Sequence, residues 1–293
     1  RHFIERAAEY TLTPFGLMLR MALRCPGLGG PVPERPAYVP APDAAGSTKA
    51  RARVLDALAE MGGAPLPPGV LAAMAGVSPG VLRAMEEEGT LRRRMLPRDA
   101  PYPDFATESG GAVLSAAQEE AAAALRAGVS AAGYATTLLR GVTGAGKTEV
   151  YLEAVVACLL AGRQALVLVP EIALTGGFRA RLAARLGNAP PEWHSDVAPA
   201  ERRRLWHAVA RGEAKLVIGA RSALFLPFTD LGLIVVDEEH DTAYKQEDGA
   251  LYHGRDMAVL RGATEGAQVV LASATPSLET WVNAQAGKYA RLD

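Results

Sequence analysis

The amino-acid sequence predicts an α/β protein in which helices cover both faces of a parallel sheet. The first observation is a set of short apolar runs, typical of buried strands, at residues 135–139, 164–169, 215–219, 232–236 and 268–272. Helical patterns separate these runs, and strands that alternate with helices form parallel sheets. The second observation is that the main polar motifs directly follow the runs. Because the carboxyl ends of parallel strands line one ligand-binding edge, we expect these motifs to form one site.

Composition limits the classes of protein to which the chain can belong. The chain has 293 residues, of which 49% are hydrophobic, and this is enough for two or three domains. Its formal net charge is −1, so any contact with nucleic acid has to be local. No apolar run approaches the roughly 18–20 residues that a membrane span needs. Cys25 and Cys158 lie far apart and suit a reduced cytosol, so we expect a cytoplasmic monomer without a membrane contact.

The first 46 residues predict two helices and a linker. Residues 1–25 carry the apolar pattern of two short helices, with Thr13 and Pro14 between them. These helices cannot bury their apolar faces alone. Since the chain begins at Arg1 in apparent mid-domain sequence, we expect them to end a domain whose earlier part is missing. Residues 26–46 are rich in proline and glycine and predict an extended, mobile linker.

Residues 47–105 predict a small domain of three helices and a β-ribbon. Pro67 and Pro68 open the second helix, and Ser78 and Pro79 open the third. This order of elements is that of a winged helix-turn-helix, and we therefore predict a winged-helix domain. The third helix ends in three glutamates that would repel phosphate, whereas arginines occupy residues 92–94 of the ribbon. We therefore favour a DNA contact by the ribbon, or a structural or protein-docking role, over insertion of the third helix into a groove.

The loop at residues 141–148 fits the phosphate-binding pattern of two spaced glycines followed by lysine and threonine. A strand precedes the loop and a helix follows it, which disfavours the alternative of a glycine-rich turn that matches by chance. Main-chain N–H groups in such a loop surround a triphosphate. Lys147 is expected to reach the β- and γ-phosphates and Thr148 to bind Mg²⁺. The predicted ATP-binding residues are Gly141, Val142, Thr143, Gly144, Ala145, Gly146, Lys147 and Thr148.

An acidic motif, residues 237–240, follows the apolar run at 232–236. Asp237 is expected to hold magnesium through water, and Glu238 to polarise the attacking water. These two residues and Lys147 are the predicted catalytic groups, and His240 is predicted to belong to the same nucleotide site. The alternative, a charged turn after a strand, is disfavoured by the phosphate loop upstream.

Three further stretches follow predicted strands. Ser273 and Thr275 are expected to hydrogen-bond the acidic motif and to couple the nucleotide state to a neighbouring domain. The stretch from Pro170 to Thr175, and the pair Arg221 and Ser222, are expected to hold a nucleic-acid backbone. As isolated strings, the last two stretches would be read as ordinary loops.

Aromatic and basic residues alternate in the loop that follows the acidic motif. Tyr244 and Tyr252 are expected to stack on bases, and Lys245 and Arg255 to contact phosphates. His253 is included in the predicted DNA-binding set. Such a loop, beside the hydrolytic site, would couple DNA occupancy to ATP turnover.

The phosphate loop, the acidic motif and residues 273–275 occur in an order that resembles the first motor lobe of superfamily 2 helicases, a RecA-like P-loop fold. Together with residues 170–175, 219–225, 244–256 and 272–280, they make the chain similar to the PriA family of replication-restart primosomal helicases. The resemblance implies that residues 106–293 are the first RecA-like lobe and that Gln118 recognises adenine. It also implies that residues 47–105 are a winged helix and that residues 1–25 end a 3′-DNA-end-binding domain.

The resemblance implies an ATP-dependent 3′-to-5′ DNA helicase that binds forked or single-stranded DNA, acts at stalled forks and initiates primosome assembly. Primosome proteins and the single-stranded DNA-binding protein are the implied partners. Family members also carry a second motor lobe with an arginine finger and a zinc module, whose ligands we do not find in this sequence. We therefore expect residues 1–293 to bind ATP and Mg²⁺ but to hydrolyse ATP poorly. A non-motor fork-binding scaffold and another superfamily 2 translocase are the alternatives.

Overall fold

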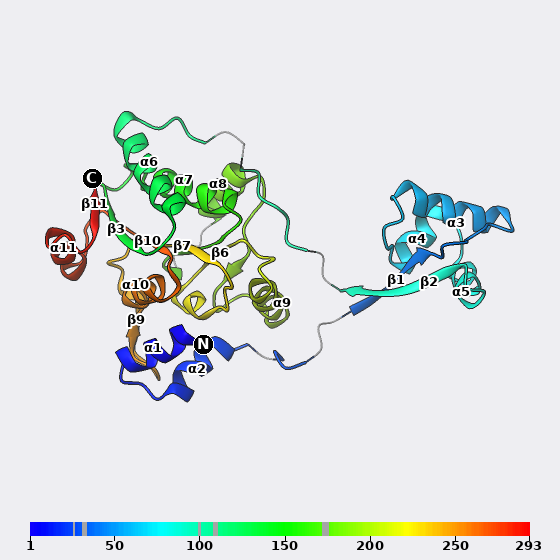
Figure 1. Cartoon of the computed structure of the whole chain (residues 1–293), viewed down its shortest axis with the longest axis horizontal. Coiled ribbons are helices and arrows are strands. Elements are labelled where there is room, and N and C mark those ends of the chain that lie inside the picture. Colours follow the sequence, from blue (N-terminus) through cyan, green and yellow to red (C-terminus); the bar gives the residue numbers. More distant parts are fainter. Residues whose placement is uncertain (26, 31–33, 99–100, 108–110, 172–175) are drawn as a thin grey trace. The chain divides into compact units, whose positions relative to one another are not determined.

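The computed structural model describes residues 1–25, 27–30, 34–98, 101–107, 111–171 and 176–293. The chain divides into two compact units (Figure 1). The larger unit comprises Arg1–Leu28 and Tyr102–Asp293, and the smaller comprises Gly29–Pro101. Within the described ranges, no helix has both the length and the apolar character that crossing a membrane requires.

A seven-stranded sheet forms the centre of the larger unit, and all of its strand pairs are parallel. In spatial order the strands are β11 (Ala290–Leu292), β3 (Ala135–Arg140), β10 (Gln268–Ser273), β7 (Leu231–Asp237), β4 (Gln164–Leu168), β6 (Leu216–Gly219) and β5 (Glu192–Trp193). The predicted α/β class is therefore confirmed, and the five apolar runs correspond to β3, β4, β6, β7 and β10. The short edge strands β5 and β11 have too few residues to produce a periodic pattern.

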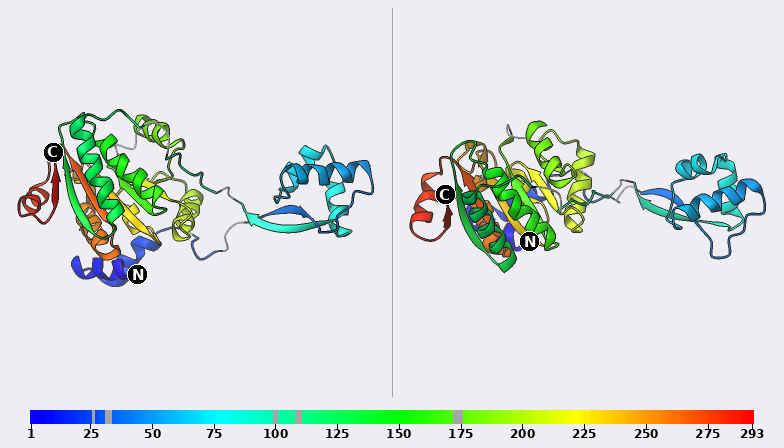
Figure 2. Two further views of the ribbon diagram at one scale, coloured as in Figure 1. Left: turned by 45° about the horizontal axis from the view of Figure 1, so that its top comes forward. Right: turned by 90° about the horizontal axis from the view of Figure 1, so that it is seen from above.

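Helices cover both faces of this sheet (Figure 2). One face packs on α6 (Ala116–Ala131), α7 (Lys147–Leu160) and α8 (Gly176–Leu186). The other face packs on α9 (Pro199–Ala210) and α10 (Gly254–Glu265). Along β7, Leu233 and Val235 face the first layer and Ile234 and Val236 face the second, as side chains alternate across a strand.

The register of the sheet brings the carboxyl ends of the central strands to one edge. Ser273 of β10 lies opposite Arg140 of β3, and Ala272 lies opposite Asp237 of β7. On the other side of β7, Val236 lies opposite Leu168 of β4. The loops that follow β3, β7 and β10 therefore start next to one another.

The two predicted N-terminal helices are α1 (His2–Tyr10) and α2 (Phe15–Leu23), and they belong to the larger unit. The Phe3 ring lies 5.8 Å from the Phe225 ring, and the Arg261 guanidinium lies 5.1 Å from the Phe3 ring. The indole of Trp206 donates a hydrogen bond to the Ala22 carbonyl at 2.9 Å. We expected these helices to end a domain whose earlier part is missing, and in the structure their apolar faces cover a helical layer of the α/β unit. Their assignment to the end of a 3′-DNA-end-binding domain stays a prediction.

The smaller unit contains the three predicted helices and a two-stranded antiparallel ribbon. Its apolar core includes Val54, Leu58, Leu71, Leu82 and Met85. Its identity as a winged helix stays a prediction. The elements are β1 (Glu34–Pro40), α3 (Lys49–Glu60), α4 (Pro68–Ala75), α5 (Pro79–Glu87) and β2 (Leu91–Pro97).

Strand β1 corrects the prediction that residues 26–46 are only a linker. It pairs with β2 along its whole length, although it contains prolines. The Tyr38 N–H donates to the Leu66 carbonyl, which lies on the side away from β2. Because Pro36 and Pro40 are each two residues from Tyr38, their nitrogens face that same side, and no bond to β2 is lost.

Candidate nucleotide-binding site

The phosphate loop connects β3 to α7 at the carboxyl edge of the sheet. Gly144 and Gly146 have φ angles of 81° and 79°, which glycine adopts without strain. A Cβ atom on Gly146 would lie 2.5 Å from the Gln118 side-chain nitrogen, so a larger residue would displace that amide. The amino end of α7 points its positive partial charge at the loop, which favours a bound phosphate.

Lys147 is the first residue of α7 and lies between the phosphate loop and the acidic motif. Its Nζ donates to the Gly141 carbonyl at 2.9 Å and lies 3.8 Å from a Glu238 carboxylate oxygen. Only 9% of its side chain is exposed. The fold therefore brings together two motifs that lie about 90 residues apart in the sequence.

Asp237 ends β7, and three hydrogen bonds hold it. The Tyr151 hydroxyl donates to Oδ2 at 2.9 Å, and the Glu238 N–H donates to Oδ1 at 3.0 Å. The Tyr244 hydroxyl donates to the Asp237 carbonyl at 2.7 Å. Burial raises the pKa of Asp237, while the bond from Tyr151 and the charge of Lys147 lower it.

Glu238, His240 and the β10 end form a second connected group. Glu238 has a φ of 46°, a left-handed backbone conformation that costs energy for a glutamate. Its carboxylate lies 3.6 Å from His240 Nδ1, which in turn lies 2.8 Å from the Ser273 hydroxyl. The Thr275 N–H donates to the same hydroxyl at 3.1 Å. Ser273 thus hydrogen-bonds the acidic motif through His240, whereas among the described residues Thr275 bonds only Ser273, and the coupling role of both residues stays a prediction.

Gln118 lies against the phosphate loop. Its Nε2 donates to the Ala145 carbonyl at 2.8 Å, and its Oε1 accepts the Ser115 N–H at 2.8 Å. The second bond belongs to a capping box with Ser115 that begins α6. This position is compatible with a nucleotide contact, and the adenine role stays a prediction.

Two of the predicted backbone-holding residues, Pro170 and Arg221, line a separate small pocket. This pocket has a volume of about 180 Å³. Arg221 begins the short helix η2 (Arg221–Phe225), and its guanidinium donates to the carbonyls of Ala243 and Lys245. Ser222 is partly exposed beside it, and Thr175 lies outside the described residues. The DNA-contact roles of Pro170, Thr175, Arg221 and Ser222 stay predictions.

The loop at residues 241–253, which we call the aromatic loop, contradicts part of the sequence prediction. Tyr244 is 1% exposed and Tyr252 is 6% exposed, so their rings are not available to stack on bases. The Tyr252 ring packs edge-on against Phe225 at 5.3 Å. Arg255, expected to contact phosphates, is buried and lies 3.5 Å from the Glu239 carboxylate. These residues point inward because they cover the apolar core and neutralise a buried acid.

Lys245 and His253, which were also predicted to contact DNA, have positions that are compatible with that prediction. Lys245 is exposed and forms a 2.8 Å ion pair with Glu247. The side chain of His253, at the end of the short strand β9 (Tyr252–His253), accepts the N–H of Arg255 and is partly buried. Their DNA contacts stay predictions.

Sequence reasoning overlooked two buried residues that organise the site. Tyr151 lies one helical turn after Lys147, and this spacing is the signal that places both on one face of α7. Glu239 is 0% exposed, and its carboxylate accepts hydrogen bonds from the Ser277 N–H at 2.7 Å and the Thr280 hydroxyl at 3.0 Å. These partners begin α11 (Leu278–Gln285), after the 273–275 motif. Nothing in the sequence distinguishes Glu239 from its acidic neighbours.

The residues present fit a magnesium ion that arrives with a nucleotide. The part of the chain that the structure describes contains no group of three His, Cys, Asp or Glu side chains able to hold a metal. Mg²⁺ typically takes one or two protein ligands and completes its shell with phosphate oxygens and water. The Asp237 carboxylate and the Thr148 hydroxyl, which both interact with the Tyr151 hydroxyl, are suitable donors.

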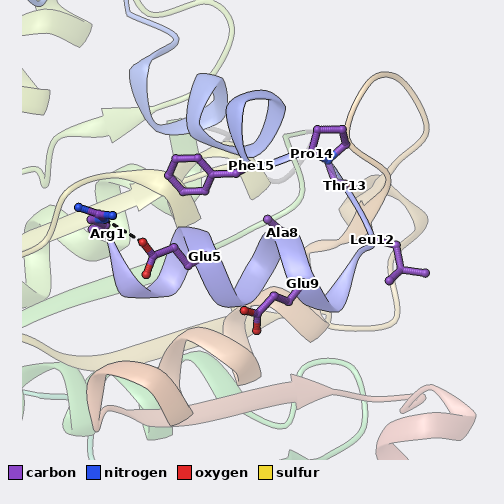
Figure 3. Close-up of a pocket in the computed structure, with 8 residues that line it drawn as sticks. All are labelled: Arg1, Glu5, Ala8, Glu9, Leu12, Thr13, Pro14 and Phe15. Atoms are coloured by element: carbon purple, nitrogen blue, oxygen red, sulfur yellow. Dashed lines mark hydrogen bonds and ion pairs between the residues drawn. The ribbon is translucent and has the colours of Figure 1, made fainter.

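A larger pocket, of about 640 Å³, lies beside α1 and the turn that follows it (Figure 3). It is lined by residues such as Glu5, Leu12 and Phe15 and contains no predicted site residue. The candidate site is therefore defined by the convergence of polar groups at the sheet edge, not by pocket size.

A family model described as DEAD/DEAH box helicase matches residues 115–283. The replication restart protein PriA of Rickettsia felis is 50% identical over 153 residues, which are 52% of this chain and 24% of that protein. PriA of Chlamydia muridarum is 39% identical over 234 residues, which are 77% of this chain and 30% of that protein. Among solved structures, the DUF1998 helicase MrfA has a TM-score of 0.45 at 22% identity, covering 63% of this chain and 30% of the MrfA chain. The chain thus spans about a quarter of the length of the Rickettsia protein.

Proposed function

The chain belongs to the DEAD/DEAH box helicase family, and we propose that it is the ATP-binding motor lobe of a DNA helicase that acts in replication restart. The observation that carries this proposal is the position of Lys147. Its ammonium lies between the phosphate loop and Glu238, where the β- and γ-phosphates of ATP would be held. A nucleotide would replace the contact of Lys147 with the Gly141 carbonyl.

Each polar group at this edge has a chemical role in the proposal. Lys147 stabilises phosphate charge, and Glu238 polarises the water that attacks the γ-phosphate. Asp237 and Thr148 hold the magnesium ion, and Gln118 lies at the loop where it would meet adenine. When bound, magnesium neutralises the phosphate charge that develops during transfer.

The contact between His240 and Ser273 supports a role in coupling. It joins the acidic motif to the end of β10 at 2.8 Å, so a change at Glu238 would alter the segment that contains Thr275. We propose that this route carries the nucleotide state to DNA-contacting residues at the same edge, which include Arg221 and Lys245.

The replication-restart role rests on the similarity to PriA proteins over the motor lobe. We propose movement in the 3′-to-5′ direction on forked or single-stranded DNA, with primosome proteins and the single-stranded DNA-binding protein as partners. We also propose that efficient hydrolysis needs a second lobe that supplies an arginine to the γ-phosphate. Residues 1–293 alone would then bind ATP and hydrolyse it slowly, with or without DNA.

Titration of residues 1–293 with a fluorescent ATP analogue tests the nucleotide site. We expect Mg²⁺-dependent binding by the wild type and at least tenfold weaker binding by Lys147→Ala, because the ammonium that holds the phosphates is lost. Lys215→Ala is the matched control, since the Lys215 Nζ also donates to a main-chain carbonyl, that of Gly162 at 2.9 Å, outside the site. Equal binding by wild type and Lys147→Ala would contradict the proposed nucleotide site.

A second measurement distinguishes the motor from a scaffold. In a longer protein that contains both lobes, Lys147→Ala should abolish DNA-stimulated ATP hydrolysis. If hydrolysis is the same in the variant and the wild type, a non-motor fork-binding scaffold is favoured. Rapid DNA-stimulated hydrolysis by residues 1–293 alone would contradict the need for a second lobe.

A further inference from the structure

Tyr151 places its hydroxyl at the two candidate magnesium ligands. It lies in α7, one helical turn after Lys147, and its side chain is fully buried. The hydroxyl donates to Asp237 Oδ2 at 2.9 Å and lies near the Thr148 side chain. The phosphate-loop helix is therefore connected directly to the acidic motif through one phenol.

Tyr244 holds the main chain of the same aspartate from the opposite side. Its hydroxyl donates to the Asp237 carbonyl at 2.7 Å, and its ring is buried. It ends η3 (Thr242–Tyr244), in the aromatic loop. Asp237 is thus held at its side chain by α7 and at its main chain by the aromatic loop.

These bonds leave the carboxylate free to bind a hydrated cation. A carboxylate oxygen has about two acceptor sites, and here Oδ1 accepts the Glu238 N–H while Oδ2 accepts the Tyr151 hydroxyl. One acceptor site on each oxygen therefore remains, and the carboxylate cannot rotate without breaking a bond.

We infer that Tyr151 is a positioning residue that fixes the orientation of the Asp237 carboxylate for the magnesium of bound ATP, while Tyr244 fixes its main chain. This inference rests on the proposed ATP-binding function. It gives Tyr244 a role at the nucleotide site in place of base stacking. The inference also distinguishes Tyr151 from tyrosines that only fill the core, because the hydroxyls of those tyrosines do not contact a reactive group.

The test measures how much Mg²⁺ half-saturates binding of a fluorescent, non-hydrolysable ATP analogue to residues 1–293. For Tyr151→Phe we expect at least a threefold higher Mg²⁺ requirement, because the carboxylate loses its orienting donor. Affinity for the analogue in EDTA should stay within twofold of the wild type. Tyr252→Phe is the matched control, since it also removes a buried tyrosine hydroxyl, and that hydroxyl has no hydrogen-bond partner among the described residues.

Each outcome decides between the inference and its alternatives. A folded Tyr151→Phe variant with an unchanged Mg²⁺ requirement overturns the inference. So does a variant that binds the analogue equally weakly with Mg²⁺ and with EDTA, because that result indicates a purely structural role. If the wild type shows no Mg²⁺-dependent binding, the proposed function itself fails and the inference falls with it.

A labelled protein tests the same point should Tyr151→Phe not fold. Incorporation of 3-fluorotyrosine at position 151 retains the hydroxyl and gives a ¹⁹F resonance beside Asp237. We expect this resonance to shift when Mg²⁺ is added to the nucleotide-saturated protein, whereas the same label at position 252 should not respond. Absence of a shift at position 151 overturns the inference.

Discussion

The phosphate loop and the aromatic loop both lie at the carboxyl edge of the sheet, but they use their residues in opposite ways. In the phosphate loop, two glycines have positive φ angles, and the Lys147 ammonium contacts the main chain. In the aromatic loop, Tyr244 and Tyr252 point into the core, and main-chain carbonyls accept hydrogen bonds from Arg221.

The difference shows which kind of motif can be interpreted from its own sequence, without knowledge of the neighbouring elements. A phosphate loop acts through its main chain, and the positions of its glycines determine the course of that main chain. A loop of alternating aromatic and basic residues acts through side chains, which can face either solvent or core. Which way they face depends on whether neighbouring elements leave apolar surface to be covered.

The largest expected effect concerns Arg255, which would be dispensable for folding if its purpose were to contact DNA. It is buried against Glu239, which is itself 0% exposed. Arg255→Met leaves that carboxylate buried without its cation and should lower the free energy of unfolding by about 3–5 kcal/mol. Urea unfolding measures this loss.

Lys245→Met is the control, because Lys245 is exposed and its pair with Glu247 contributes little. An Arg255→Met variant as stable as the wild type, but weaker in DNA binding, would restore the original interpretation that Arg255 contacts phosphates.

A smaller effect at alkaline pH tests whether Tyr252 is buried in solution. Burial raises the pKa of Tyr252 to about 12 from its usual value of 10.0. Since the unfolded chain loses this proton first, the stability that Tyr252 contributes is complete below pH 10 and is lost between pH 10 and 12. At pH 7.5 the Tyr252→Phe variant and the wild type should have similar free energies of unfolding. On going to pH 11 the variant should lose about 1.4 kcal/mol less of that free energy than the wild type. Thermal unfolding at both values of pH measures the difference, and equal alkaline losses in variant and wild type would indicate an exposed ring.

The smallest expected effect concerns Lys245, the exposed cation of the aromatic loop. Lys245→Ala should leave the stability unchanged and weaken single-stranded DNA binding about two- to fivefold. It should also reduce the slope of log affinity against log salt by about 0.7, as expected for one phosphate contact. Fluorescence anisotropy at several salt concentrations measures both quantities. An unchanged slope would mean that Lys245 makes no phosphate contact.

Much of the fold follows from local pattern. The five apolar runs form the five main strands of the sheet, because a short apolar run between helices is typical of a parallel strand that is buried on both faces. The phosphate loop between β3 and α7 could be predicted equally well, since the spacing of its glycines and lysine itself determines the conformation of the loop. The three helices of the smaller unit also follow from their prolines and apolar spacing.

The errors fall where a residue's partner is distant in the sequence. Strand β1 was read as linker because its prolines weaken the strand pattern, yet their nitrogens face away from β2. The apolar face of residues 1–25 likewise finds its cover far along the chain, where the Phe3 ring packs against Phe225. In both cases the sequence shows the apolar surface but not what covers it.

The sequence by itself determined the class of the fold, the order of the motifs and the residues of the phosphate loop, because these depend on short-range spacing. Only the tertiary structure decided that Tyr151 meets Asp237, that Tyr244 supports the same residue, and that Arg255 neutralises Glu239. Long-range burial governs these contacts, since a buried polar group must find a partner wherever the fold supplies one. Spacing along the chain cannot identify that partner.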